Sequence, residues 1–296
     1  MKVPALPAGH ITVRILCALL ILMTFPRAAT AGWEEVLDHA PWVPATLHGA
    51  VVFNGSLWLL SATYGTWTSS DGYTWTQTCA SPPWPNGRYA CVFDGRIWII
   101  CGYSSKSIWN SADGISWNCV AEETPLRYRH YHTVAVFQNK MWVFGGYVGD
   151  EPTLGRDLAD LWNSSDGINW NLVTDTPPWR LRRYSAAIVF QDRLWLIGGL
   201  WGDPSTGWEI LLNDVWSTED GVNWTQVCEH APWRGRDRHS LAVFDDKMWM
   251  IGGDYGGITE FGGVWYTSDG INWMPDYTVT NCVPRWSPAS VVYDNK

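Results

Sequence analysis

Several features are scarce or missing in this sequence, and each of them excludes a class of protein. The chain has 20 basic residues against 29 acidic residues, and it contains no cluster of lysine and arginine. We therefore expect neither nucleic acid nor an anionic membrane surface as a partner. No apolar run approaches the ~20 residues that a membrane-spanning helix requires. At 46% hydrophobic residues, the 296-residue chain is also too apolar for a disordered protein.

The first 31 residues have the features of an export signal. Lys2 and Arg14 precede an apolar stretch that ends at Phe25, and the small residue Ala31 fits the cleavage position. The alternative is a signal anchor that is not cleaved. We expect residues 1–31 to be removed and the remainder, 32–296, to form one propeller domain. The mature protein is then expected to be secreted or periplasmic, monomeric and not inserted in a membrane.

Metal and cofactor motifs are absent from the sequence. No C-x-x-C pair, Cys/His grouping, phosphate loop or nucleophile elbow occurs, so we expect no metal and no cofactor. Seven cysteines are present, of which Cys17 lies in the predicted signal. The other six are Cys79, Cys91, Cys101, Cys119, Cys228 and Cys282. An even number in an exported chain indicates disulfide bonds, but the irregular spacing selects none of the possible pairings.

Tryptophan is abundant, and most of it lies in a repeat. The pattern W-x-[ST]-x-D-G-x-x-W occurs five times, beginning at Trp67, Trp109, Trp162, Trp216 and Trp265. Ahead of each copy, an apolar segment ends in Phe, and a Trp follows five residues later. These pairs are Phe53/Trp58, Phe93/Trp98, Phe137/Trp142, Phe190/Trp195 and Phe244/Trp249. One structural unit is therefore repeated along the chain.

Each unit is expected to contain four short strands, which we call a, b, c and d. Asp-Gly between c and d is a strong hairpin signal, because Gly adopts positive φ without strain and Asp hydrogen-bonds the neighbouring backbone. Units of this length stack radially in β-propellers, where bulky Trp side chains fill the space between sheets. We predict an all-β propeller with five recognisable four-stranded blades.

The two ends of the chain predict a sixth blade. The segment at Trp33 resembles a strand d that lacks its own a, b and c, and residues 285–293 resemble a strand a without a following b. We expect the chain to be C-terminally incomplete and this blade to be shared between the two ends. In this chain the ring is expected to be open or poorly closed between Trp33 and Tyr293, although in the intact protein it would leave no exposed edge.

These features resemble kelch-repeat propellers, in which an apolar strand a is followed by an aromatic residue, a Gly-Gly pair and a c/d hairpin ending in Trp. The most specific matches are Trp142–Gly146, Trp195–Gly199 and Trp249–Gly253. The resemblance covers nearly all of residues 32–296 and implies the kelch-type propeller fold. The c/d hairpins also resemble the Asp-boxes of sialidases, which have one more residue between Asp and Gly.

The two faces of the predicted propeller differ in loop length. The a/b and c/d turns are nearly the same in every unit, whereas the b/c connections vary and carry inserts in units three to five. Variable loops on a constant scaffold indicate a binding face. The insert around residues 200–214 holds Trp201 and Trp208, which lie outside the repeat and are candidates for stacking on a sugar or anchoring a partner.

Basic side chains are expected to surround the channel mouth on this same face, where strand a begins. The candidate ligand-binding residues are His48, Arg88, Arg129, His132, Arg183, Arg238, His239 and Arg285. They predict capture of an anionic group such as a carboxylate, which Arg contacts with two parallel hydrogen bonds. The alternative is that Arg and His at this repeat position bond the loop carbonyls of the next unit.

Two classes of function remain open. The first is a non-catalytic recognition propeller that binds a protein or glycan ligand through its b/c and d/a loops. The second is implied by the family resemblance: some exported kelch-type propellers, such as N-acetylneuraminate epimerases, do chemistry at the channel mouth. That chemistry would require an acid/base pair from His132, His239 or Glu260. The sequence contains no recognisable catalytic constellation, which favours the first class.

Overall fold

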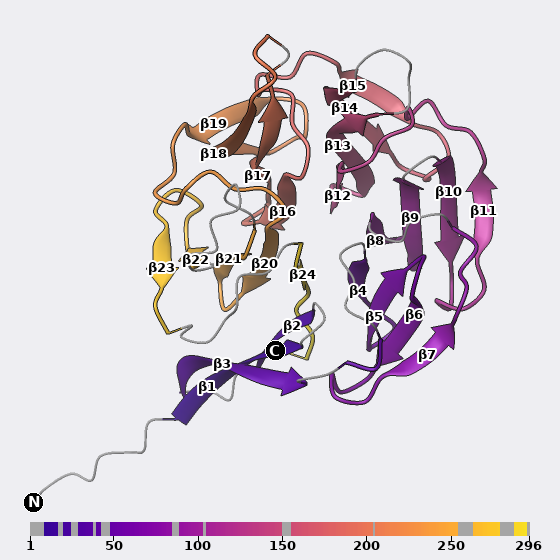
Figure 1. The fold of residues 1–296 in the computed structure, drawn as a ribbon, viewed down its shortest axis with the longest axis vertical. Helices are drawn as coiled ribbons and strands as arrows, with labels where there is room; N and C mark the ends of the chain where they lie inside the picture. The colour runs from indigo at the N-terminus through magenta and orange to yellow at the C-terminus, as the bar shows by residue number, and fades with distance from the viewer. Residues whose placement is uncertain are drawn as a thin grey trace, which may run out of the picture.

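The computed structural model describes residues 9–16, 20–24, 29–37, 40–42, 48–84, 89–102, 105–149, 155–203, 205–253, 263–278 and 287–294. Every regular element in these segments is a β-strand. The strands form six four-stranded sheets arranged as a ring (Figure 1). Within the same segments, no helix has the length and apolar character needed to cross a membrane.

Five of the sheets are antiparallel blades that follow one another along the chain. Blade 1 comprises β4 (Gly49–Phe53), β5 (Ser56–Ser61), β6 (Gly65–Ser69) and β7 (Thr76–Cys79). Blade 2 comprises β8 (Ala90–Phe93), β9 (Arg96–Gly102), β10 (Ser105–Ser111) and β11 (Asn118–Ala121). Blade 3 comprises β12 (Thr133–Phe137), β13 (Lys140–Val148), β14 (Arg156–Ser164) and β15 (Asn171–Thr174).

The last two of these blades have the same plan. Blade 4 comprises β16 (Ala186–Phe190), β17 (Arg193–Gly202), β18 (Glu209–Thr218) and β19 (Trp224–Cys228). Blade 5 comprises β20 (Ser240–Phe244), β21 (Lys247–Ile251), β22 (Val264–Thr267) and β23 (Met274–Asp276). The predicted five four-stranded blades of a propeller are confirmed.

The position of a strand in its blade explains its pattern of apolar residues. The first strands lie at the centre, each beside the first strand of the next blade (Figure 1). The second strand is buried along nearly its whole length, as in β5 and β13, because a neighbouring blade covers each face of its sheet. The fourth strand, at the rim, is only half buried.

The sixth sheet joins the two ends of the chain. Its order is β24 (Ala289–Ser290), β2 (Leu20–Thr24), β1 (Gly9–Leu16) and β3 (Ala29–Leu37), so the N-terminal and C-terminal strands share one sheet, as predicted. The expected opening of the ring is not found. Strands β1 and β2 fill it and give β3 and β24 hydrogen-bonding partners, and both of these pairings are parallel. The export signal stays a prediction.

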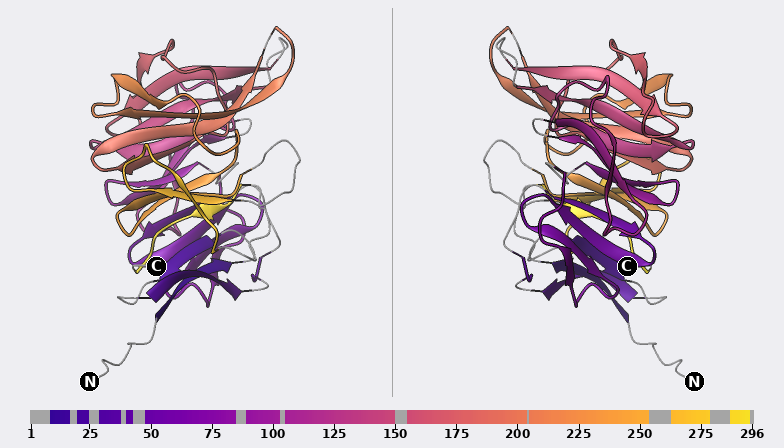
Figure 2. Two further views of the ribbon diagram at one scale, coloured as in Figure 1. Left: turned by 90° about the vertical axis from the view of Figure 1, so that its left-hand side faces the viewer. Right: turned by 90° about the vertical axis from the view of Figure 1, so that its right-hand side faces the viewer.

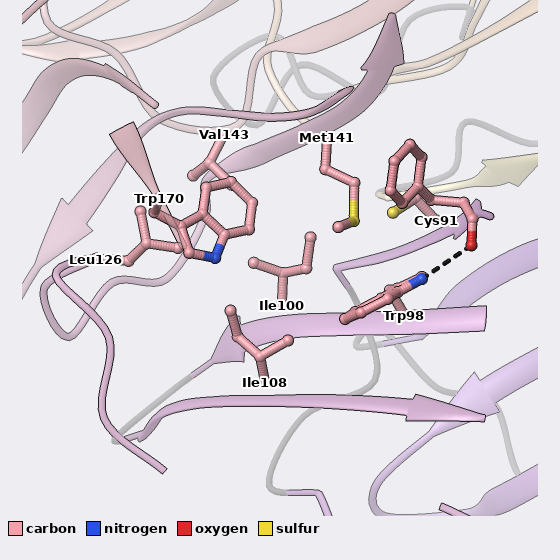
Figure 3. Packing of buried hydrophobic residues seen from close by; sticks show 9 residues of the cluster. Cys91, Trp98, Ile100, Ile108, Leu126, Met141, Val143 and Trp170 are labelled. Carbon is pink, nitrogen blue, oxygen red and sulfur yellow. Dashed lines mark hydrogen bonds between the residues drawn. The ribbon is translucent and has the colours of Figure 1, made fainter. Parts of the chain in front are cut away.

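The hydrophobic core is divided into clusters that lie between neighbouring blades. Figure 3 shows the cluster between blades 2 and 3, where Trp98 and Ile100 of β9 pack with Met141 and Val143 of β13. Comparable clusters join blades 1 and 2, 3 and 4, and 4 and 5. Each Trp of the second strand also donates its indole N–H to the carbonyl of the Phe five residues earlier, at 2.9 to 3.1 Å.

The Asp-Gly turns have the same hydrogen bonds in all five blades. In blade 3, the Ser164 hydroxyl accepts the Gly167 N–H at 2.8 Å, and Asp166 Oδ1 accepts the N–H groups of Ile168 and Asn169. Gly167 has φ 75°, and a Cβ at this position would lie 2.2 Å from the Trp98 ring of blade 2. The turn glycines of blades 2, 4 and 5 meet the preceding Trp in the same way. The turns of blades 2 to 5 are therefore also contacts between blades.

The described cysteines form no disulfide bond. Cys79, Cys91, Cys119 and Cys228 are free thiols, and burial raises the pKa of Cys91 to about 12. Cys282 and the side chain of Cys101 lie outside the described part of the chain. The expected disulfide framework is therefore not found among the cysteines that the structure describes. The reason is positional: Cys79, Cys119 and Cys228 lie on the outer strands of three different blades.

The contact between the turn and the preceding blade predicts different costs for two glycine substitutions. Gly167→Ala strains a positive φ and pushes a methyl group into Trp98, whereas Gly55→Ala strains a similar φ in open space. We expect Gly55→Ala to cost about 1 kcal/mol and Gly167→Ala about 1 to 3 kcal/mol more. Denaturant unfolding of both variants measures the difference. Equal losses would show that the turn glycine is needed only for its φ.

The turn carboxylates predict a dependence of stability on acid pH. Backbone N–H groups of Ser116 and Ile115 lower the pKa of Asp113 from 3.8 to about 2. Because the folded pKa is the lower one, the stabilisation is complete above pH 3.8 and is lost as the pH falls through about 2. We expect Asp113→Asn to lower the Tm at pH 7, and the gap from the unaltered protein to shrink between pH 4 and pH 2. Calorimetry over this range tests it, and a constant gap would contradict it.

Candidate functional site

The first strands begin around a cavity at the channel mouth. The cavity has a volume of about 240 Å³ and is lined by the starts of β4, β12, β16 and β20 together with β24. His48, His132, Ser185 and His239 stand at the same repeat position and all line it, as expected from their spacing. The sequence repeat thus brings residues that are far apart along the chain to one opening.

His132 and His239, which line this mouth, are both buried. His132 Nε2 lies 3.1 Å from the carbonyl of Ile100, which is in β9 of the preceding blade. The contact joins two blades, but it does not use a loop carbonyl of the next unit, which is what the structural alternative predicts. Burial, together with the charge of Arg236, lowers the pKa of His239 to about 3. His239 is therefore uncharged at neutral pH and does not attract an anion by its charge.

The residues that precede His132, Ser185 and His239 have an unusual backbone. The φ angles of Tyr131, Tyr184 and Arg238 are 60°, 58° and 55°, in the left-handed region that residues with a Cβ rarely adopt. The bend lets the N–H of Tyr184 donate to the Tyr131 carbonyl at 2.8 Å and that of Arg238 donate to the Tyr184 carbonyl at 3.1 Å. Hydrogen bonds that run from blade to blade thus hold this strained conformation.

The same three residues form a row of stacked side chains. The rings of Tyr131 and Tyr184 stack with centroids 4.0 Å apart, and the Arg238 guanidinium lies 4.0 Å from the Tyr184 ring centroid. Burial and the neighbouring Tyr131 raise the pKa of Tyr184, so its hydroxyl stays protonated. We call this set the tyrosine row. It lines both the channel cavity and a second cavity beside it.

The second cavity, of about 320 Å³, lies off the channel axis over blades 3 and 4. Besides the tyrosine row, its walls include Tyr147, Arg183, Glu209 and Asp237. The Arg183 guanidinium lies 5.0 Å from the Tyr147 ring centroid and forms ion pairs with Asp157 and Glu209. Arg183, predicted from the sequence as a ligand-binding residue, thus faces a cavity, and acidic residues of the inserts partly neutralise it.

A second series of arginines holds the blades together. The Arg182 guanidinium donates to both oxygens of Asp214 in its own blade, at 2.8 and 2.7 Å. Its backbone bonds blade 3, donating to the Leu158 carbonyl and accepting the Gly146 N–H. Burial would raise the pKa of Asp214, but the hydrogen bonds and charge of Arg182 lower it. Arg182 therefore clamps two blades.

Arg129 belongs to this clamp series. It is fully buried, and its guanidinium donates to both oxygens of Asp160 and to the Gly145 carbonyl. Its two terminal nitrogens, Nη1 and Nη2, are thus occupied within blade 3, although the sequence predicted Arg129 as a ligand contact. Arg236 has the same place in blade 5 and donates to backbone carbonyls.

The two tryptophans of the insert have different surroundings. The guanidinium of Arg180 lies over Trp201, 4.6 Å from the centroid of the Trp201 ring, whereas Trp208 is 73% exposed. Trp208 closes the β17–β18 hairpin, which projects from the ring (Figure 2). The Asp203 N–H donates to the Trp208 carbonyl at 2.8 Å. The Gly207 N–H donates to the Asp203 carbonyl, and the Thr206 hydroxyl donates to the Asp203 carboxylate. The exposed Trp208 ring thus stands on a hydrogen-bonded turn.

The remaining predicted residues and the missed ones can now be placed. Arg88, Arg285 and Glu260 lie outside the described residues. Sequence analysis did not single out Tyr131 and Tyr184, although each stands six residues before the Phe of its strand a, and this shared spacing could have revealed them. Within the described ranges, no three His, Cys, Asp or Glu side chains form a group that could hold a metal ion.

Comparisons with known proteins agree with this architecture. The Kelch motif family matches residues 128–162. The chain is 27% identical to the leucine-zipper-like transcriptional regulator 1 homolog of Drosophila melanogaster over 76% of its own length, and 32% identical to tRNA wybutosine-synthesizing protein 2/3/4 of Oryza sativa subsp. japonica over 39%. It spans only 31% and 11% of these two relatives. The solved structure of YjhT matches with a TM-score of 0.55 at 16% identity, covering 66% of each chain.

The clamp arginines predict a coupled loss of stability. Arg182→Met leaves the Asp214 carboxylate without its charge partner in a largely buried site, and we expect a loss of about 3 to 5 kcal/mol. In Arg182→Met/Asp214→Asn, the charge is removed while the acceptor for the Trp216 indole N–H stays. The double variant should therefore lose less free energy of unfolding than the sum of the losses in Arg182→Met and Asp214→Asn, as measured by denaturant unfolding. Simple additivity would show that the pair is not coupled.

Proposed function

We propose that this kelch-repeat β-propeller is a recognition module that binds a partner protein through its b/c and d/a loop face. The observation that carries the proposal is the combination on this face of the 320 Å³ cavity, walled by the tyrosine row and Arg183, with the exposed Trp208. Trp, Tyr and Arg are the residues that dominate binding energy at protein interfaces. Kelch propellers generally mediate protein interactions, which supports the same function.

The anchors on this face are held in place before a partner binds. The turn at Asp203 fixes the hairpin that carries Trp208, and backbone hydrogen bonds between blades fix Tyr131 and Tyr184. Side chains that are already ordered lose little conformational entropy on binding. Ile210, two residues after Trp208, is also exposed and extends the apolar contact.

A protein partner suits the layout better than a small sugar. The hairpin tip projects from the ring, whereas the cavity lies over the blades, and a ligand that uses both must be a surface of some extent. Tyr and Trp also stack on sugars, so glycan binding is the competing outcome of the test. Export by the predicted signal would place the partner outside the cytoplasm.

Selection of binding peptides tests the proposal. We expect a random peptide library displayed on phage to yield peptides whose affinity falls at least about tenfold in Trp208→Ala, because an exposed anchor is removed. The matched control is Tyr73→Ala, an exposed aromatic residue on the opposite, short-turn face. If a glycan array gives binding and the peptide library gives none, or if Tyr73→Ala has the same effect as Trp208→Ala, the proposal is wrong.

A further inference from the structure

Two carboxylates share Arg183, and their surroundings differ strongly. Asp157 binds Nη1 at 2.5 Å, its side chain is only 1% exposed, and it also accepts the Gly202 N–H at 2.6 Å. Glu209 binds Nη2, and its side chain is 62% exposed. Asp157 is thus a buried, doubly bonded counter-ion, whereas Glu209 reaches Arg183 from the solvent side.

The difference in exposure determines which carboxylate can be replaced. Removing a buried partner leaves an unpaired charge in the interior and is costly, so Asp157 stays. An exposed ion pair contributes about 0 to 1 kcal/mol, so the Glu209 contact breaks easily. Nη2 of Arg183 is therefore the edge of the guanidinium that can change partners.

We propose that Glu209 holds the place of a carboxylate of the partner, which displaces it from Nη2 of Arg183 when the partner binds. The inference rests on the proposed function and specifies its chemistry: the recognised group is an acidic side chain or a C-terminal carboxylate. Asp157 and the Tyr147 ring fix the guanidinium, so the incoming carboxylate meets an oriented donor. Arg238, which is paired with Asp237 at 3.4 Å, lines the same cavity.

The exchange gives Glu209 one role in the empty cavity and another when the partner binds. Asp157 already balances the charge of Arg183, so while no partner is bound Glu209 adds a second carboxylate, which keeps the cavity from attracting small anions from solution. When the partner binds, one ion pair is broken for each one formed, and the released Glu209 repels the new carboxylate at short range. Glu209 therefore weakens binding and selects partners that offer further contacts. Its removal should strengthen binding, which is the reverse of the usual effect of losing a residue at a binding site.

Short peptides with one carboxylate test this exchange. The probes are acetyl-Gly-Glu-Gly-amide for a side-chain carboxylate, acetyl-Gly-Gln-Gly with a free C-terminus, and acetyl-Gly-Gln-Gly-amide as the neutral reference, titrated by NMR. We expect Glu209→Gln to strengthen binding of at least one acidic probe about three- to tenfold, while the neutral probe is unaffected. Arg183→Gln should abolish this preference, and added salt should weaken acidic binding in Glu209→Gln.

The control uses a similar ion pair elsewhere. Arg193 and Glu219 form an exposed pair by the short turns of blade 4, and Glu219→Gln removes the same charge far from the cavity. Unchanged binding in Glu209→Gln, or equal strengthening in Glu219→Gln, would overturn the exchange. If a library peptide binds in a Trp208-dependent way and Glu209→Gln does not alter its affinity, the exchange is wrong while the proposed function stands. A Tm close to that of the unaltered protein shows that the variant is folded.

Discussion

The contact on which this propeller depends is made by the Trp of the second strand in blades 1 to 4. Its indole N–H is bound to a Phe carbonyl of its own blade, and its ring lies against the glycine of the Asp-Gly turn in the next blade. Because the glycine has no side chain, turn and ring approach closely. The hydrogen bond orients the Trp, the turn geometry positions the glycine, and the clusters between blades form around them.

This contact also explains why the two faces of the ring differ. The short turns must keep Ser or Thr, Asp and Gly in register, since each residue of the turn is bonded or packed, so this face varies little. The opposite face is also held by the clamp arginines and by backbone hydrogen bonds between blades, but its b/c loops vary in length. The short-turn face is thus uniform, whereas the opposite face carries the tyrosine row, the cavities and the projecting hairpin.

Arg182 and Arg183 show how far local sequence can be interpreted. They are neighbours in the chain and have the same charge, but Arg182 is buried against Asp214 whereas Arg183 lines a cavity. The extended backbone between them turns successive side chains to opposite sides, and the packing of blades 3 and 4 decides which side is interior. The sequence predicted a positive cluster at the mouth, and the structure divides it into clamp residues and cavity residues.

The sequence by itself determined the repeat, the four-strand unit and the propeller, because turn chemistry and the spacing of Phe and Trp are local properties that five copies repeat. It also placed the binding candidates on the face with variable loops. Only the tertiary structure decided which of them reach a cavity. Tyr131 and Tyr184 meet because blades 3 and 4 are adjacent in the ring, and Asp157 and Glu209 meet Arg183 from two different inserts. The sequence also predicted that the two ends share a sheet, but the parallel pairings in that sheet were beyond local pattern, since pairing of distant segments depends on which edges remain unpaired once five blades have formed.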